Sequence, residues 1–63
     1  MKDNKKLLVV LDYSNSSVHF YRVDEGLKID ENFISKIGHH PSNSEWMYAP
    51  DVEIIWHSGI NDD

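Results

Sequence analysis

Two apolar stretches near the N-terminus predict a β-hairpin. Residues 7–13 are almost continuously apolar, a pattern typical of a short strand that is covered on both faces. Residues 14–17 are serine and asparagine, which favour turns. Residues 17–23 are rich in β-branched and aromatic side chains. We therefore expect two antiparallel strands in which Leu11 lies opposite Phe20.

The segment after this hairpin predicts one short helix. Asp30 can accept hydrogen bonds from the free backbone amides of a first turn. Gly38 stands where helices commonly end in a left-handed residue. Ile29 and Ile34 occupy the two positions of a hydrophobic staple. A helix of about two turns is marginal alone, so we expect the sheet to hold it through an apolar stripe of Phe33, Ile34 and Ile37.

A second pair of strands is predicted over residues 46–49 and 52–57, on either side of Pro50 and Asp51, because proline favours type I turns. The first and last strands are the most apolar, so we place them at the centre. The predicted fold class is α+β: a ββαββ chain with an antiparallel sheet of order 2-1-4-3 and one short helix on one face. Without regular structure over residues 46–49, the sheet would have three strands.

The length of 63 residues allows one small domain. We take residues 1–63 as that domain, with residues 1–6 and 58–63 as flexible tails. The longest apolar run, Leu7–Leu11, is far shorter than the ~20 residues of a membrane helix, and it is shorter than the core of a signal peptide. The sequence therefore predicts a cytoplasmic protein without a membrane partner.

Alternation along the strands separates two faces of the predicted sheet. The more apolar face, which we expect to lie under the helix, carries Leu7, Val9, Leu11, Tyr13, Val18, Phe20, Met47, Val52, Ile54 and Trp56. The second face carries Leu8, Val10, Tyr21, Val23, Trp46, Tyr48 and Ile55. Since one helix cannot lie on both sides of a sheet, these seven residues of the second face are the predicted partner-binding residues.

An exposed aromatic and aliphatic patch is typical of a protein interface. Trp46 and Tyr21 are its expected anchors, because aromatic residues dominate binding hot spots. We expect either a second copy of the chain, giving a homodimer, or a different protein as the partner. No catalytic residue, cofactor or small-molecule substrate is predicted, because the serines lie in turns, the glycines form no phosphate loop and cysteine is absent.

The charge distribution narrows the class of partner. The net charge is −5, and half of the six positive residues lie within the first six positions. Capture of nucleic-acid phosphate needs clustered lysine and arginine, so direct nucleic-acid binding is not expected. A basic protein surface would be attracted instead. The alternative that follows is an acidic nucleic-acid mimic that blocks a basic site on a host or defence protein.

The four histidines raise a further alternative, a small His/carboxylate metal-binding module. His19 and His57 share the second face with Asp12 and Glu53. The adjacent residues His39 and His40 match no standard zinc spacing. The predicted register places Asp12 opposite His19, and we interpret these two as an ordinary cross-strand pair. No metal ligand is assigned.

Several short motifs resemble small uncharacterised proteins of bacteriophages and mobile elements. They are Leu-Asp-Tyr-Ser at 11–14, Val-His-Phe-Tyr at 18–21, Phe-Ile at 33–34, Gly-His at 38–39, Ser-Asn at 42–43, Glu-Trp-Met at 45–47 and Glu-Ile-Ile at 53–55. The resemblance implies a phage-type accessory protein that acts by binding, often as an inhibitor, in the cytoplasm of a bacterial host cell. It implies no site residues.

Overall fold

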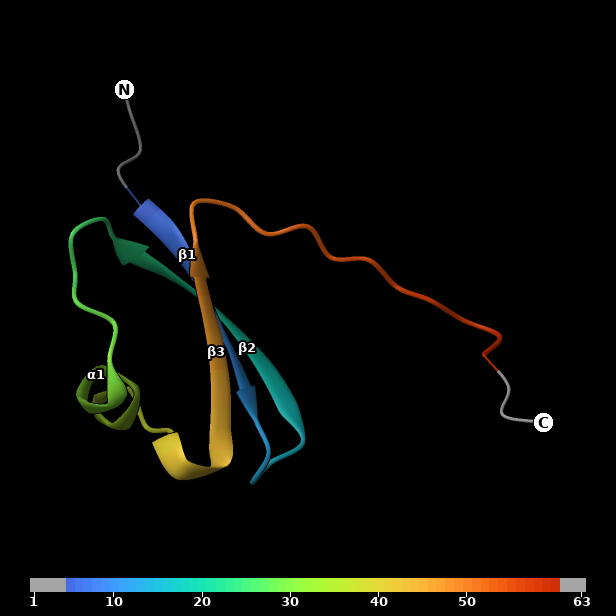
Figure 1. Cartoon of the computed structure of the whole chain (residues 1–63), viewed down its shortest axis with the longest axis horizontal. Coiled ribbons are helices and arrows are strands. Elements are labelled where there is room, and N and C mark those ends of the chain that lie inside the picture. The colour runs from blue at the N-terminus through green and yellow to red at the C-terminus, as the bar shows by residue number, and fades with distance from the viewer. Residues whose placement is uncertain (1–4, 61–63) are drawn as a thin grey trace.

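A computed structural model of the chain describes residues 5–60, which form a three-stranded antiparallel sheet and one short helix (Figure 1). The elements are β1 Lys5–Asp12, β2 Ser17–Asp24, α1 Glu31–Lys36, the single 3-10 turn η1 Pro41–Asn43, and β3 Ser44–Ala49. The strand order is β2-β1-β3. The α+β class is therefore confirmed, whereas the four-stranded ββαββ arrangement is not observed.

The first hairpin forms with a register two residues away from the predicted one. Leu11 lies opposite Val18, and Val9 lies opposite Phe20. Asp12 ends the strand because its carboxylate accepts hydrogen bonds from the backbone amides of Ser14 at 3.0 Å and Asn15 at 3.3 Å. Such side-chain bonds favour a turn over continued pairing. A slip of two residues keeps every side chain on its predicted face.

The predicted strand over residues 52–57 is wrong, and so is the strand order 2-1-4-3. β3 pairs directly with β1, with Met47 opposite Val9 and Ser44 opposite Asp12. The turn η1 delivers the chain to β1 at Ser44, so β3 occupies the edge that had been assigned to the later strand. Pro50 follows β3 and has no backbone N–H for a ladder. Residues 50–60 run away from the sheet without helix or strand (Figure 1).

Both predicted ends of the helix are confirmed. The carboxylate of Asp30 accepts a hydrogen bond from the backbone amide of Phe33 at 3.0 Å. At the other end, Gly38 has φ +102°. The amide of Gly38 bonds to the carbonyl of Ser35, and the amide of His39 bonds to the carbonyl of Ile34, each at 3.1 Å. These paired bonds form a Schellman motif, which fixes where His39 leaves the helix.

The helix covers the opposite face of the sheet from the one predicted. Its buried residue Ile34 forms the core with Leu8, Val10 and Val23. The error has two causes. Residues 52–57 are not part of the sheet, so their apolar side chains add nothing to the face that had been assigned to the helix. The covered face also carries polar groups whose burial requires hydrogen-bond partners, and the segment after the helix supplies one through His39.

The ends of the sheet are set by β1. It begins at Lys5, so residues 5 and 6 belong to the sheet although a flexible tail was predicted over residues 1–6. The rest of that predicted tail, residues 1–4, and residues 61–63 of the other tail lie outside the described residues. Within residues 5–60, no helix has the length and apolar character that crossing a membrane requires.

Candidate interaction surface and a buried polar cluster

Six of the seven predicted partner-binding residues lie on the face that the helix covers. Leu8, Val10 and Val23 are buried in the core, and Tyr21, Trp46 and Tyr48 pack against it. The seventh, Ile55, lies outside the sheet and is 62% exposed. The expectation that this face is uncovered is therefore wrong. A binding role for these seven side chains stays a prediction, but the exposed apolar face is the opposite one.

That opposite face, called the open face below, is defined by three rows of side chains that cross the strands. In each row a β1 residue lies between one residue of β3 and one of β2. The rows are Met47–Val9–Phe20, Glu45–Leu11–Val18 and Ala49–Leu7–Arg22. The edge residues Val18, Phe20 and Met47 are 54%, 47% and 51% exposed. The open face therefore presents large apolar side chains to solvent, with charged residues in its outer rows.

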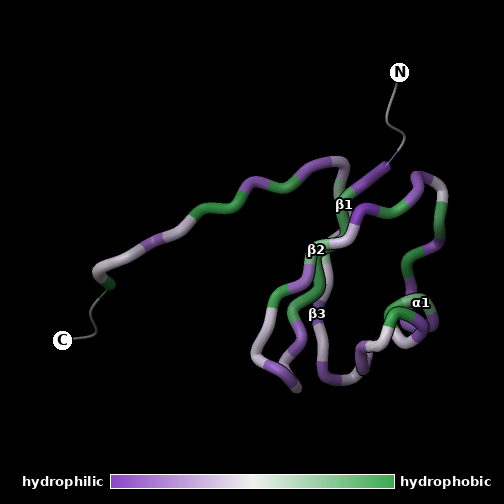
Figure 2. Tube along the Cα trace, turned by 180° about the vertical axis from the view of Figure 1, so that it is seen from behind, coloured by the Kyte–Doolittle hydropathy of each residue, from purple (hydrophilic) through white to green (hydrophobic). Residues whose placement is uncertain are grey.

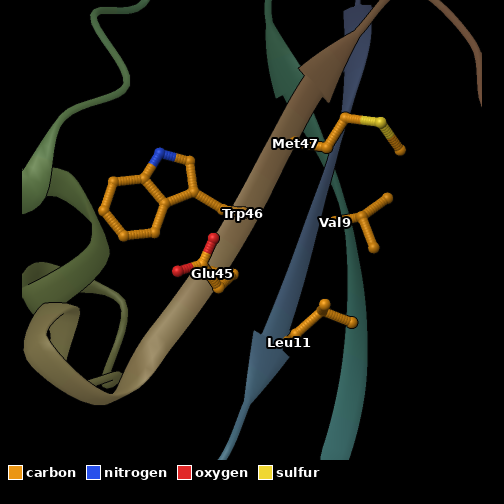
Figure 3. A pocket seen from close by; sticks show the side chains of 5 residues that line it. All are labelled: Val9, Leu11, Glu45, Trp46 and Met47. Atoms are coloured by element: carbon orange, nitrogen blue, oxygen red, sulfur yellow. The ribbon is translucent and has the colours of Figure 1, made fainter.

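The open face is hollowed between β1 and β3. A pocket of about 300 Å³ is lined by Val9, Leu11, Glu45, Trp46 and Met47. In Figure 3, the side chains of Val9, Leu11 and Met47 project to one side of the sheet, whereas Trp46 points towards the helix. The hollow is thus apolar on its floor and carries one carboxylate at its border. A volume of this size is at the lower end of the range for small ligand sites.

Residues 50–60, called the arm below, add a second exposed apolar element. Ile54, Ile55, Trp56 and Ile60 are all exposed, and Trp56 reaches 90%. The trace in Figure 2 shows apolar stretches along the arm outside the body of the molecule. Ile54, Ile55 and Trp56 share a second hollow of about 300 Å³ with Val18 and Phe20. The arm therefore leaves the sheet on the side of the open face.

A polar cluster lies at the end of the covered face where β1 finishes. Asp12 and His39 are 4% and 6% exposed. The Asp12 Oδ2 atom lies 2.7 Å from His39 Nδ1, and the hydroxyl of Tyr21 lies 2.7 Å from His39 Nε2. An ionised carboxylate can only accept, so His39 Nδ1 donates to Asp12. In the neutral imidazole, Nε2 then accepts from the hydroxyl of Tyr21.

The pKa of the Asp12 carboxyl is lowered below its ordinary value of 3.8. The main cause is the hydrogen bond from His39, and burial of the carboxyl acts in the opposite direction. The side-chain and backbone hydrogen bonds from Asn15 and the charge interaction with His39 lower this pKa further. The arrangement therefore keeps Asp12 ionised as the acceptor at the centre of both the turn and the cluster.

His19 completes the cluster. Its ring meets that of His39 edge-on, with ring centres 4.6 Å apart, and its Nε2 lies 2.8 Å from the hydroxyl of Ser17. The sequence pattern placed Asp12 near His19, and the structure brings them together, although Asp12 pairs in register with Ser17. It missed His39. A histidine directly after the helix-ending Gly38 was the signal that could have found it.

The geometry of the cluster favours metal binding by the two histidines over direct binding by Asp12 together with His39. Ligand atoms of Asp12, His19 and His39 lie within 4.8 Å of one another. However, Asp12 Oδ2 and His39 Nδ1 are 2.7 Å apart, which is closer than the roughly 3.3 Å between two ligands of a tetrahedral zinc ion. In this arrangement Asp12 can orient His39 through a hydrogen bond. His39 Nε2 and His19 would then be the ligands, and a metal ion would have to displace the Tyr21 hydroxyl from His39 Nε2. The arm residues His57 and Glu53, named in the sequence-based hypothesis, are not part of this group.

Comparisons with protein-family models, with curated proteins and with solved structures give no match.

Proposed function

We propose that this chain is a non-enzymatic protein-interaction module that docks through the open face, with a second copy of itself as the first partner. The observation that carries the proposal is the unequal cover of one sheet. The helix packs on one face, whereas Val18, Phe20 and Met47 on the other face remain about half exposed. Contiguous apolar surface of this kind marks interaction sites on small proteins.

The small size of the core supports association. Among residues 5–60, the large side chains that are fully buried are Leu8, Val10 and Ile34. A chain of about 60 residues buries a smaller share of its surface than a larger domain does. Burying a further large apolar side chain contributes about 1.5–3 kcal/mol. Docking on the open face would therefore raise the stability of the fold as well as bind the partner.

Charge and resemblance support a regulatory role for the complex. Where the partner is a different protein, the net charge of −5 favours one with a basic rim. The resemblance to small phage proteins supports an accessory or inhibitory role in a bacterial host. The acidic nucleic-acid mimic stays an alternative prediction, and salt separates the two. Affinity of a mimic falls steeply as salt rises, whereas apolar docking responds little.

The test measures association of purified protein by sedimentation velocity at micromolar concentration. We expect the unmodified chain to sediment as a dimer and Phe20→Glu to sediment as a monomer, because a charge in the middle row cannot be buried without a partner. Leu27→Glu is the matched control. Leu27 is also an exposed apolar residue, at 43%, but it lies in the segment between β2 and α1, so this variant should remain dimeric.

Circular dichroism of both variants checks that the fold is retained. A wild-type chain that is monomeric over the whole micromolar range would contradict self-association. Equal loss of dimer in Phe20→Glu and Leu27→Glu would contradict the assignment of the interface to the open face.

A second candidate function is binding of a divalent transition metal by His39 and His19. The observation that favours it is the hydrogen bond from His39 to Asp12, because metal-binding histidines commonly donate their other N–H to a carboxylate. Isothermal titration of the untagged protein with Zn²⁺ tests it. We expect one equivalent to bind in the wild type and none in His39→Ala, with His57→Ala behaving as the wild type. Absence of stoichiometric binding by the wild type would contradict it.

A further inference from the structure

We propose that the arm of one copy lies across the open face of a second copy, and that the two copies exchange arms reciprocally. This inference rests on the proposed function, because it names the element that covers the open face. In the exchanged pair, Ile54, Ile55 and Trp56 of each arm pack on Val18 and Phe20 of the other sheet.

The sequence of the arm is that of a strand. Val52 to Trp56 alternates apolar and charged residues at its start and is rich in β-branched and aromatic side chains. The structure nevertheless gives residues 50–60 neither helix nor strand. An apolar segment outside any ladder can become ordered when its side chains dock on the surface of a partner. The arm therefore has the character of an element that becomes ordered on docking.

The accessible surface of the chain is larger than that of a compact protein of the same mass. The accessible surface is 5334 Å², whereas a compact protein of 7.3 kDa exposes about 4,200 Å². A stable interface removes about 800 Å² from each partner. The radius of gyration, 14.1 Å, is likewise larger than the roughly 11 Å of a compact 63-residue chain. The extended arm thus gives the chain more exposed surface than a compact protein of this mass has, by an amount larger than one side of a stable interface buries.

The direction of the arm favours a second copy over closure on its own sheet. The molecule is 48 Å along its longest axis, and Figure 1 shows that the arm accounts for much of this length by pointing away from the strands. Eleven extended residues span up to about 36 Å, which exceeds the roughly 27 Å of an eight-residue strand. An arm of this length can cross the whole open face of a neighbour.

The hollow between the arm and β2 indicates which residues of the arm and of β2 would pack together. Within one chain, a gap of about 300 Å³ separates Ile54, Ile55 and Trp56 from Val18 and Phe20. All five side chains are about half exposed or more. The same apolar groups that face each other across this gap can close it when the arm comes from a second copy. Exchange of one identical element between two protomers is a common route to dimers.

Disulfide trapping tests the inference directly, because the natural chain has no cysteine. The single variants Val18→Cys and Ile55→Cys are mixed in equal amounts under mild oxidation. We expect a disulfide-linked heterodimer at several times the yield obtained when Leu27→Cys replaces Val18→Cys in the mixture. Equal yields from the two mixtures would overturn the exchange.

The double variant Val18→Cys/Ile55→Cys distinguishes the alternatives on non-reducing gels. A covalent dimer supports exchange. A covalent loop within a single chain shows that the arm closes on its own sheet and overturns exchange. Dimerisation that depends on Phe20 but gives no crosslink also overturns exchange, although it leaves the proposed function intact.

The arm can also be weakened without touching the open face. Trp56→Ala should raise the dimer dissociation constant by about thirtyfold, as expected for a central aromatic anchor. Ile60→Ala is the control with the smaller expected change, since Ile60 does not line the shared hollow. An unchanged dissociation constant in Trp56→Ala would overturn the inference.

Discussion

The two faces of the sheet are built from the same three strands, and they differ mainly in what surrounds them. On the covered face, the β1 residues Leu8 and Val10 are fully buried in a core that includes Ile34 of the helix. On the open face, the β1 residue Val9 is only 8% exposed, because Phe20 and Met47 flank it from the neighbouring strands. The outer strands of the open face stay exposed. The middle of the central strand is thus shielded by its neighbours, whereas Leu11 near the strand end, at 39% exposed, and the two edge strands lack such cover.

The faces also differ in where their polar groups lie. The covered face places Asp12, His39 and Tyr21 in one hydrogen-bonded cluster beside the apolar core. The open face keeps its charged residues, Glu45 and Arg22, in its outer rows. Apolar content alone therefore does not determine which face of the sheet the helix covers. The demand of buried polar groups for partners also decides it.

The strongest test of the comparison removes one leucine from each face. Leu8→Ala should lower the free energy of unfolding by about 2–5 kcal/mol, because it leaves a cavity in the core. Leu11→Ala, on the open face and 39% exposed, should lower it by less than about 1 kcal/mol. Urea unfolding at a concentration where the protein is monomeric measures both. Similar losses would show that the two faces are equally covered.

Acid should weaken the covered face through Asp12. The pKa of Asp12 is lowered by folding, so the folded state binds this proton less readily than the unfolded state. The stabilisation is present above the ordinary pKa of 3.8 and is lost as pH falls towards the lower folded pKa. The free energy of unfolding of the wild type should decrease when pH falls from about 5 to about 3.

The variant Asp12→Asn isolates this effect, since other carboxyl groups still titrate in it. Its unfolding free energy should be lower than that of the wild type near neutral pH and should depend less on pH in this range. Identical pH profiles for the two proteins would show that the Asp12 cluster does not act on folding.

Gly38→Ala tests the turn that brings His39 to the covered face. Gly38 has φ +102°, and a methyl group there meets no atom within 4 Å. The cost is therefore conformational, and we expect about 1–2 kcal/mol of lost unfolding free energy. Gly59→Ala is the matched control, because Gly59 also has a positive φ of +74° but lies on the arm. It should leave thermal unfolding of the monomer unchanged.

Ser44→Ala should have the smallest effect, in the stabilising direction. The hydroxyl of Ser44 is buried opposite Asp12 and has no hydrogen-bond partner among the described residues. Removing an unpaired buried polar atom should raise the free energy of unfolding by about 1 kcal/mol. Ser42→Ala, at an exposed position of η1, should change nothing measurable. Destabilisation by Ser44→Ala would indicate that this hydroxyl is satisfied.

The parts of the fold that depend on local chemistry could be predicted from the sequence. The two strands of the first hairpin, the cap at Asp30 and the helix end at Gly38 follow from neighbouring residues. Their alternation also predicted correctly which strand residues share a face. The register slipped by two because the hydrogen bonds of Asp12 with the turn compete with strand pairing.

The parts that depend on distant segments could not be predicted in the same way. Residues 52–57 have the composition of a strand, but β3 pairs with the edge of β1 at which these residues were predicted to pair. The side chain of His39 reaches Asp12 from 27 positions along the chain. Its position directly after Gly38 indicates that it leaves the helix there but does not specify Asp12 as its partner. The members of the open face on the three observed strands were predicted correctly, but Val52, Ile54 and Trp56 are not part of the sheet. The exposure of this face depends on which side of the sheet the helix covers.

Each chain carries one arm and one open face. Because the two are equal in number, an exchanged assembly can be complete with only two chains. A linear assembly of subunits always has one uncovered open face and one undocked arm at its ends, so further subunits can add to it. Two chains related by a twofold axis leave neither, because every donor meets an acceptor within the pair. A subunit whose face is blocked but whose arm is intact would then act as a terminator when it is mixed with normal subunits.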